Sequence, residues 1–188
     1  GSIERPISFG NNDRPGIVLA SAAKEYMKVY ETLVGKKPII FTNNDTAYST
    51  ALEFIKNYIE PINLDTRESA NGELGKEVQQ KGCSSKFNSG IPNTKGHLKI
   101  NSAISGKLDS SKESFISEES VECDCICMSG GWTPTVHLSS QAGNKLKFND
   151  DIDAFVPDKK RQKETAIGAA NGSFTLNQSL AEGFQVGF

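Results

Sequence analysis

The fold of this chain is decided by the stretch KKPIIFTNNDTAYSTA, residues 36–51. Residues 38–41 form a short apolar run, too brief for a helix and rich in Ile and Phe, which predicts a strand. The polar residues 43–45 favour a turn, and Asp45 or its neighbour can cap the helix that we expect from about 45 to 57. A strand that runs directly into a helix N-terminus is typical of the start of a nucleotide-binding unit.

A second strand and helix follow this unit. Residues 59–64 are the next strand candidate, although Pro61 indicates an imperfect or edge strand. Residues 71–80 form a polar helical pattern that ends near Gly82. The order βαβα predicts a right-handed parallel arrangement. Upstream, the apolar spacing of residues 17–33 predicts a further helix.

The pattern changes after residue 90. Short alternating runs over 90–108 predict antiparallel strands, and 120–128 is the strongest later strand. The remaining elements that we expect are a helix begun by Thr133 and Pro134 and ending near Gln141, small strands at 145–148 and 154–156, a strand at 165–167, a glycine turn at 168–172 and a helix at 173–182.

The last elements repeat the strand–turn–helix pattern of the opening stretch, and the chain begins as if a strand lay upstream. We therefore predict a split architecture, in which the ends of the chain belong to one outer dinucleotide-binding domain. The predicted parts are 1–34 as a partial outer segment with a connecting helix, 36–150 as an inserted nucleotide-binding-like domain, and 151–188 as the returning outer segment.

Composition describes an ordinary globular protein, with 36% hydrophobic and 23% charged residues among 188. The net charge of −2 gives no electrostatic reason to expect nucleic acid or an anionic membrane as a partner. No apolar run reaches the roughly 18 residues of a membrane span, and no signal segment opens the chain, so we expect a cytoplasmic location. The chain does not begin with Met, so Gly1 and Ser2 are either an added remnant or internal sequence.

The turn after the first strand lacks the glycines of a dinucleotide-binding loop. On the pattern G-x-G-x-x-G, the three glycine positions hold Thr42, Asn44 and Ala47. A side chain at the middle position obstructs the approach of a pyrophosphate, although Asp65 stands where a ribose-binding acid is expected. We favour a structural role for this turn over tight binding of NAD.

The turn at 168–172 has glycine at both ends, and there the backbone can approach a ligand closely. Exposed N–H groups at such a turn suit a pyrophosphate, but for the turn taken alone we favour plain packing of a strand against a helix.

The cysteines and histidines are the remaining candidates for metal binding or catalysis. Cys123, Cys125 and Cys127 alternate, so on one strand their side chains would share a face at intervals of about 7 Å. This spacing differs from the C-x2–4-C turn of zinc sites, and small buried hydrophobes explain it better. His97 and His137 belong to no catalytic arrangement, so we predict neither catalytic nor metal-binding residues in this chain.

Several segments together resemble the α subunits of heterotetrameric sarcosine oxidases, within the pyridine nucleotide–disulfide reductase-like flavoproteins. They run in family order along essentially the whole chain. The matching segments are residues 1–6, 11–16, 41–48, 128–135 and 168–172. The family's first strand and its G-x-G-x-x-G turn precede the segment seen here, so we expect an internal section of such a subunit.

The resemblance implies an α/β fold: a Rossmann-like parallel sheet of the NAD(P)H-domain type with an antiparallel β-meander crossover, plus end segments of a split FAD/NAD-type domain. It also implies NAD in the outer domain, with FAD and FMN elsewhere in the parent complex. The partners implied are the other subunits of the oxidase and the rest of the same α subunit. The implied activity is an oxidoreductase that demethylates sarcosine to glycine with O2 and tetrahydrofolate, the isolated chain being inactive.

One departure from the reductase relatives concerns the cofactor. Their last strand ends in Gly-Asp, in which the Asp binds the flavin ribityl chain, whereas this chain has Gly168-Ala169. A dinucleotide without a flavin is therefore easier to accommodate here. The resemblance gives as NAD-lining candidates Gly168, Ala169, Gly172, Phe174 and Leu176. The alternative is a non-catalytic α/β scaffold or interaction module that binds no dinucleotide.

Overall fold

In the computed structural model, which describes residues 1–187, the chain divides into two compact units. The central unit comprises Pro6–Gly131, and the terminal unit comprises Gly1–Arg5 together with the described residues from Trp132 onward. The units therefore change after residues 5 and 131, whereas the predicted parts change near residue 35 and after residue 150. The division into an outer and an inserted domain stays a prediction.

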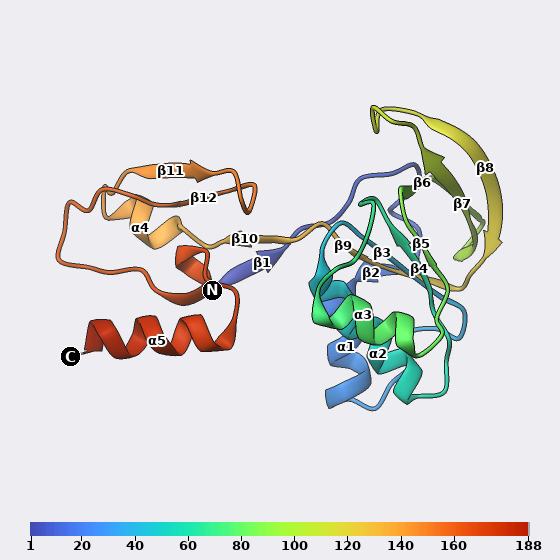
Figure 1. Ribbon diagram of the computed structural model, residues 1–188, viewed down its shortest axis with the longest axis horizontal. Helices are drawn as coiled ribbons and strands as arrows, with labels where there is room; N and C mark the ends of the chain where they lie inside the picture. The colour runs from blue at the N-terminus through green and yellow to red at the C-terminus, as the bar shows by residue number, and fades with distance from the viewer. Residues whose placement is uncertain (188) are drawn as a thin grey trace. The chain divides into compact units, whose positions relative to one another are not determined.

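The central unit is built on a parallel sheet in the order β2-β9-β3-β4-β5 (Figure 1). Its strands are β2 (Ile17–Leu19), β3 (Pro38–Thr42), β4 (Ile62–Asp65), β5 (Ser85–Lys86) and β9 (Cys125–Ser129). Its helices are α1 (Ala20–Val29), the 3-10 turn η1 (Asp45–Ala47), α2 (Tyr48–Lys56) and α3 (Glu73–Gln80). The predicted βαβα order is confirmed, because β3, β4 and β5 run parallel with α2 and α3 between them.

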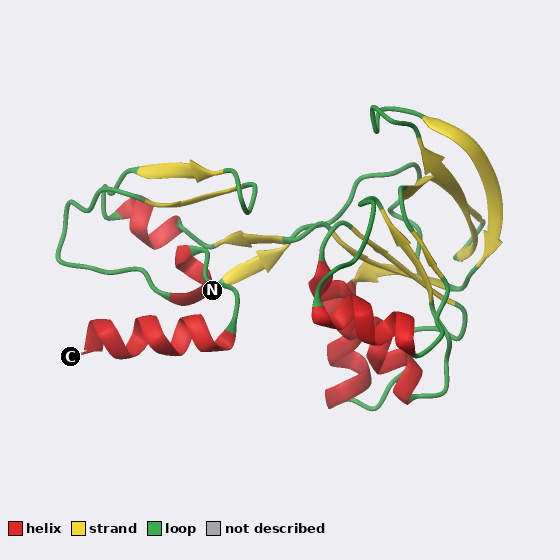
Figure 2. Cartoon of the chain, viewed as in Figure 1, coloured by secondary structure: helices red, strands yellow, loops and turns green. Residues whose placement is uncertain are grey.

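A second sheet of the central unit is antiparallel, as predicted. It contains β6 (Ser89–Gly96), β7 (Ile100–Leu108) and β8 (Phe115–Glu122), in that order. The helices α1, α2 and α3 gather on one side of the central unit (Figure 2). The predicted fold class is therefore confirmed: a parallel nucleotide-type sheet with an antiparallel meander between β5 and β9.

Two hydrophobic clusters fill the faces of the parallel sheet. Ile40 joins Phe54 and other helix residues in one cluster, whereas Ile39 and Phe41 join Ile100 of the meander in the other. This split follows from the two-residue period of a strand, because successive side chains point to opposite faces. The central unit thus has three layers, and both sheet faces are covered, as parallel sheets require.

The terminal unit contains short elements. Strand β1 (Ser2–Glu4) pairs with β10 (Trp132–Pro134), and β11 (Leu146–Asn149) pairs with β12 (Ala154–Pro157). Its helical elements are α4 (His137–Gln141), the 3-10 turn η2 (Gly168–Asn171) and α5 (Leu176–Gly187). Both hydrophobic clusters lie in the central unit, and the buried apolar core residues of the described part of the terminal unit are Ala154 and Val156. The terminal unit therefore has little core of its own.

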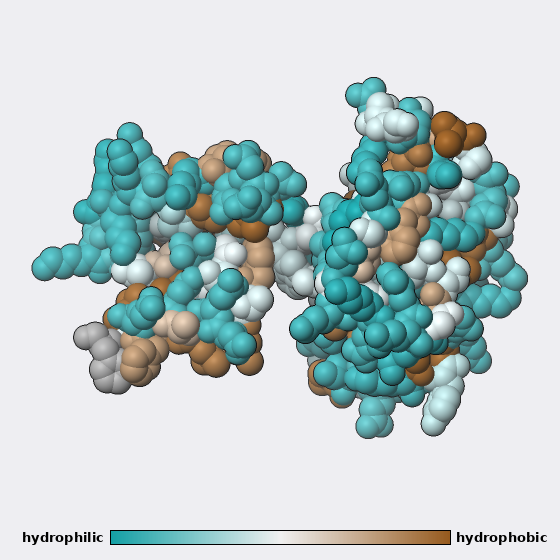
Figure 3. Space-filling model, in the orientation of Figure 1, coloured by the Kyte–Doolittle hydropathy of each residue, from teal (hydrophilic) through white to brown (hydrophobic). Residues whose placement is uncertain are grey.

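Helix α5 presents its apolar side outward. Leu176, Leu180 and Phe184 are 73%, 63% and 68% exposed, whereas the partly buried side carries Ser179 and Glu182. Hydrophobic residues are accordingly visible over α5 in the space-filling view (Figure 3). A helix of a complete globular unit has the opposite polarity.

Two strand assignments differ from the sequence prediction. Residues 17–19 were expected in a helix but form β2, because Ile17 to Leu19 pair with Ile126 to Met128 of β9. Residues 120–128 were expected as one strand but end β8 and begin β9, in different sheets. The break falls at Asp124, whose carboxylate accepts hydrogen bonds from the Lys36 and Lys37 N–H groups at 2.8 Å.

Three assignments near the end of the chain were also wrong. Thr133 and Pro134 belong to β10, paired with β1, and α4 begins only at His137. Residues 165–167 contain no strand: Ile167 has extended backbone, but no partner strand lies beside it in the described chain. The last helix begins at Leu176 instead of Ser173, because the Thr175 hydroxyl accepts from the Gln178 N–H at 3.3 Å and caps it.

Candidate functional site

The turn between β3 and α2 is bonded to the end of β9 by its own side chains. Asn44 Nδ2 donates to the Ser129 carbonyl at 3.0 Å, and Thr42 Oγ1 donates to the same oxygen at 3.1 Å. Asn44 Oδ1 accepts from the Thr46 N–H at 3.1 Å, which caps the helical turn, as the sequence predicts for Asp45 or its neighbour. Two of the three residues at the glycine positions, Thr42 and Asn44, therefore have structural hydrogen-bond partners.

Asp65, at the end of β4, is engaged in the same way. Its carboxylate is buried and accepts from Tyr48 Oη at 2.9 Å and from the Arg67 backbone N–H at 2.9 Å. Arg67 Nη2 lies 2.8 Å from Asp65 Oδ2 and 2.7 Å from Asp45 Oδ1. Asp65, which the sequence suggests as a ribose-binding acid, thus already accepts hydrogen bonds from protein donors.

The pKa values of the neighbours reflect this network. Burial, followed by the negative charge and hydrogen bond of Asp65, raises the pKa of Tyr48 well above its ordinary value. Burial lowers the pKa of Arg67, but its bonds to Asp65 and Asp45 outweigh that effect and raise the pKa overall. Two carboxylates and one guanidinium leave one net negative charge at this sheet edge, which disfavours a phosphate.

The loop after β4 also lies close to this edge. A Cβ atom on Gly72 would come within 1.5 Å of Asp45 Oδ2, so a larger residue there would displace the Asp45 carboxylate that contacts Arg67. Sequence inspection missed Arg67, whose signal is a basic residue two positions after a strand-terminal acid.

The second candidate is the turn in the terminal unit. Gly168 and Gly172 have φ angles of +62° and +88°, which favour glycine because other residues are strained there. The Gly168 N–H donates to Glu182 Oε2 at 2.6 Å, and the Ser173 hydroxyl donates to Glu182 Oε1. These bonds lower the pKa of Glu182, the Ser173 bond contributing most. The turn therefore already binds an anion, the carboxylate of α5.

The predicted NAD-lining residues fall at different depths around this turn. Gly168 is buried, Ala169, Gly172 and Phe174 are half-buried, and Leu176 lies on the exposed side of α5. The structure places Gly168 and Gly172 at the two ends of η2. Sequence inspection missed Glu182, although it is the one charged residue between positions 176 and 187.

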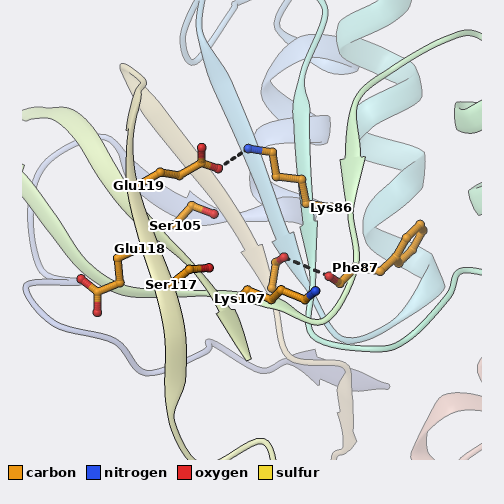
Figure 4. Close-up of a pocket in the computed structure, with 8 residues that line it drawn as sticks. Lys86, Phe87, Ser105, Lys107, Ser117, Glu118 and Glu119 are labelled. Atoms are coloured by element: carbon orange, nitrogen blue, oxygen red, sulfur yellow. Dashed lines mark hydrogen bonds and ion pairs between the residues drawn. The ribbon is translucent and has the colours of Figure 1, made fainter. Parts of the chain in front are cut away.

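A polar groove opens between β5 and the meander of the central unit (Figure 4). It measures about 470 Å³, and an ion pair between Lys86 and Glu119 spans it. The other residues that line it are Phe87, Ser89, Ser105, Lys107, Ser117 and Glu118. Two lysines and two glutamates balance in charge, so the groove favours neither an anion nor a cation.

The cysteines are buried, as predicted, but they do not share one face. Cys125 and Cys127 lie in the cluster beneath the helices, whereas Cys123 lies in the cluster beneath the meander, because it precedes β9 where the chain changes sheet. Burial, followed by the nearby Cys125 and Asp124, raises the pKa of Cys123 to about 12. Among residues 1–187 no group of three or more His, Cys, Asp or Glu side chains is arranged to hold a metal.

Comparison with known proteins adds to this geometry. No protein-family model matches the sequence. Sarcosine oxidase subunit alpha of Corynebacterium sp. (strain P-1) is 31% identical over 189 residues, which is 100% of this chain and 19% of that protein. Its counterpart from Rhizobium meliloti (strain 1021) is 32% identical over 187 residues, 97% of this chain and 17% of the relative. The chain therefore spans about a fifth of these relatives.

Structural comparison gives the fold. Thioredoxin reductase from T. acidophilum superposes with a TM-score of 0.62 at 11% identity, over 92% of this chain and 59% of that structure. No helix within residues 1–187 has the length and apolarity of a membrane span. Along its whole length the chain is thus similar to a segment of sarcosine oxidase subunit alpha, as its sequence motifs predict, and it has a fold of the disulfide reductase type.

Proposed function

We propose that this chain works as part of a sarcosine oxidase-type oxidoreductase, in which it contributes one side of an NAD site and a scaffold. The observation that carries the NAD assignment is the turn at 168–173, where a backbone N–H and a hydroxyl converge on a carboxylate. Donors that bind one anion in this geometry suit a phosphate oxygen equally well. The NAD-lining residues proposed are Gly168, Ala169, Gly172, Phe174 and Leu176.

The split-domain arrangement is part of the same proposal. Strand β1 pairs with β10, and Arg5 Nη1 donates to the Asp153 carbonyl at 2.7 Å, so the two ends of the chain contribute to one unit. That unit exposes the apolar side of α5 and has little core. Both features support an outer dinucleotide-binding domain that is completed by further parts of a longer polypeptide.

The activity follows from the resemblance and from the similarity to the two sarcosine oxidase α subunits. In this proposal the parent enzyme demethylates sarcosine to glycine with O2 and tetrahydrofolate, and FAD and FMN are held by other parts of the complex. This chain supplies no catalytic group. Its partners are the remaining subunits and the rest of its own subunit.

A second candidate function is a scaffold that binds no dinucleotide. The central unit favours it, because Thr42, Asn44 and Asp65 at the sheet edge are all bonded to protein groups. In this alternative the nucleotide-type sheet serves only to position its neighbours.

Titration of the 188-residue chain with NAD, followed by backbone amide shifts in NMR, separates the candidates. Shifts confined to residues 168–176 support the proposed site. Shifts over residues 42–47 would place the dinucleotide on the central unit instead. An unchanged spectrum at millimolar NAD would favour the scaffold for this chain.

A further inference from the structure

Helix α5 is attached to the glycine turn by polar contacts. Ser179 Oγ donates to the Ser173 carbonyl at 3.2 Å, and Glu182 accepts from Gly168 and Ser173. The apolar residues of α5 lie on its exposed side, so they add little to this attachment. The position of the helix on the turn therefore depends strongly on the Glu182 carboxylate.

Glu182 holds the donors that the proposed NAD site needs. The Gly168 N–H points to Oε2 at 2.6 Å, and the Ser173 hydroxyl points to Oε1. One N–H group cannot serve a carboxylate and a phosphate at full strength together, and two negative charges at this distance repel each other. A dinucleotide phosphate and Glu182 thus exclude each other at this turn.

We propose that Glu182 is an internal latch, which occupies the phosphate position of the 168–173 turn and leaves it when a dinucleotide binds. The inference rests on the proposed NAD site and adds its regulation. Because the carboxylate is tethered through α5, its effective concentration at the turn is in the millimolar range or higher. We expect the latch to lower the affinity for NAD about tenfold, which corresponds to about 1.4 kcal/mol for the charge-assisted hydrogen bonds that Glu182 gives up.

The test compares two variants that lose one negative charge each. Glu182→Gln keeps the shape and an acceptor oxygen for the Gly168 N–H but removes the charge. Asp151→Asn removes a charge in the same unit, at an exposed side chain that makes no hydrogen bond within residues 1–187, so it controls for net charge. Both variants and the wild type are titrated with NAD and with inorganic pyrophosphate, by calorimetry and by the Gly168 amide shift, after circular dichroism confirms folding.

The latch predicts that Glu182→Gln binds NAD and pyrophosphate about tenfold more tightly than wild type, while Asp151→Asn stays within twofold. Equal binding of all three proteins would overturn the latch and leave the NAD site intact. Weaker binding by Glu182→Gln would also overturn it, since Glu182 would then support the site. Absence of binding in all three proteins would overturn both the latch and the proposed NAD site.

Discussion

Arg67 Nη2 lies 2.8 Å from the buried Oδ2 of Asp65 and ties the loop after β4 to the end of that strand. The same nitrogen reaches Asp45 Oδ1 at 2.7 Å, in the turn after β3. One guanidinium thus joins the carboxyl ends of two neighbouring parallel strands, the position at which α/β sheets usually bind ligands.

Replacement of Arg67 by Met should destabilise the chain. The substitution leaves the carboxylate of Asp65 buried without its ion partner, and breaking a buried pair costs about 3 kcal/mol. Arg67 is one-third exposed, so solvent screening reduces the expected loss to about 1–2 kcal/mol. Urea unfolding measures this loss of folding free energy. The exposed Lys81→Met is the control, with an expected change below about 0.5 kcal/mol; an equally small change for Arg67→Met would show that water replaces the guanidinium.

Tyr48→Phe should cost about 1–2 kcal/mol of folding free energy, because the fully buried hydroxyl donates to a charged oxygen of Asp65. Combined with Arg67→Met, the two losses should not add, since both residues serve one carboxylate. A double-mutant cycle in urea checks this coupling. Strict additivity would mean that the two bonds act independently.

The turn between β7 and β8 should depend on the ionisation of Asp109. Hydrogen bonds from Ser114 and Ser111 lower the pKa of this carboxyl from 3.8 to about 2. A lowered folded-state pKa means that the contribution of Asp109 is fully present above pH 3.8 and is lost as the pH falls through about 2. Side-chain carbon NMR shifts of Asp109 report the titration. A midpoint near 3.8, or one unaffected by Ser114→Ala, would contradict these bonds.

Cys123 should resist alkylation in the folded chain. Its thiol is buried and its pKa is raised to about 12, so the reactive thiolate is scarce near neutral pH. Iodoacetamide at pH 8, read by mass spectrometry of peptides, should modify Cys123 only after addition of urea. Rapid labelling in the native state would show that the junction between β8 and β9 opens.

Leu180→Glu should leave the stability of the chain within about 0.5 kcal/mol, because that side chain is 63% exposed on α5. It should also reduce the binding of an apolar dye and any self-association, since the outward side of α5 is apolar. Dye fluorescence and light scattering measure both effects. Asn177→Glu, on the same helix, adds the same charge without removing apolar surface and should change neither.

Much of the central unit could be predicted from local pattern. The run from Pro38 to Phe41, followed by a turn and a helix, is a strong local signal, and the fold class followed from it. The strand Ile17–Leu19 escaped prediction because three apolar residues before a helix fit its periodicity equally well. Only the distant β9, more than a hundred residues later, makes them a strand.

The sites divide in the same way. The sequence shows a turn with glycine at 168 and 172, and the structure gives both residues the positive φ angles that favour glycine. The sequence also shows that the 42–47 turn lacks glycine. The sequence does not show which side chains occupy these two turns. Glu182 and Arg67 reach them through side-chain contacts that local spacing does not encode.

The sequence by itself determined the α/β class, the order of strands and helices around residues 36–51, and the resemblance along the chain, because these depend on periodicity and on short motifs. The tertiary structure alone decided that the predicted strand divides near Asp124 into β8 and β9 of different sheets, that Asp65 is paired with Arg67, and that α5 turns its apolar side outward. Those outcomes depend on the packing of residues far apart in the chain, where burial and pairing outweigh local preference.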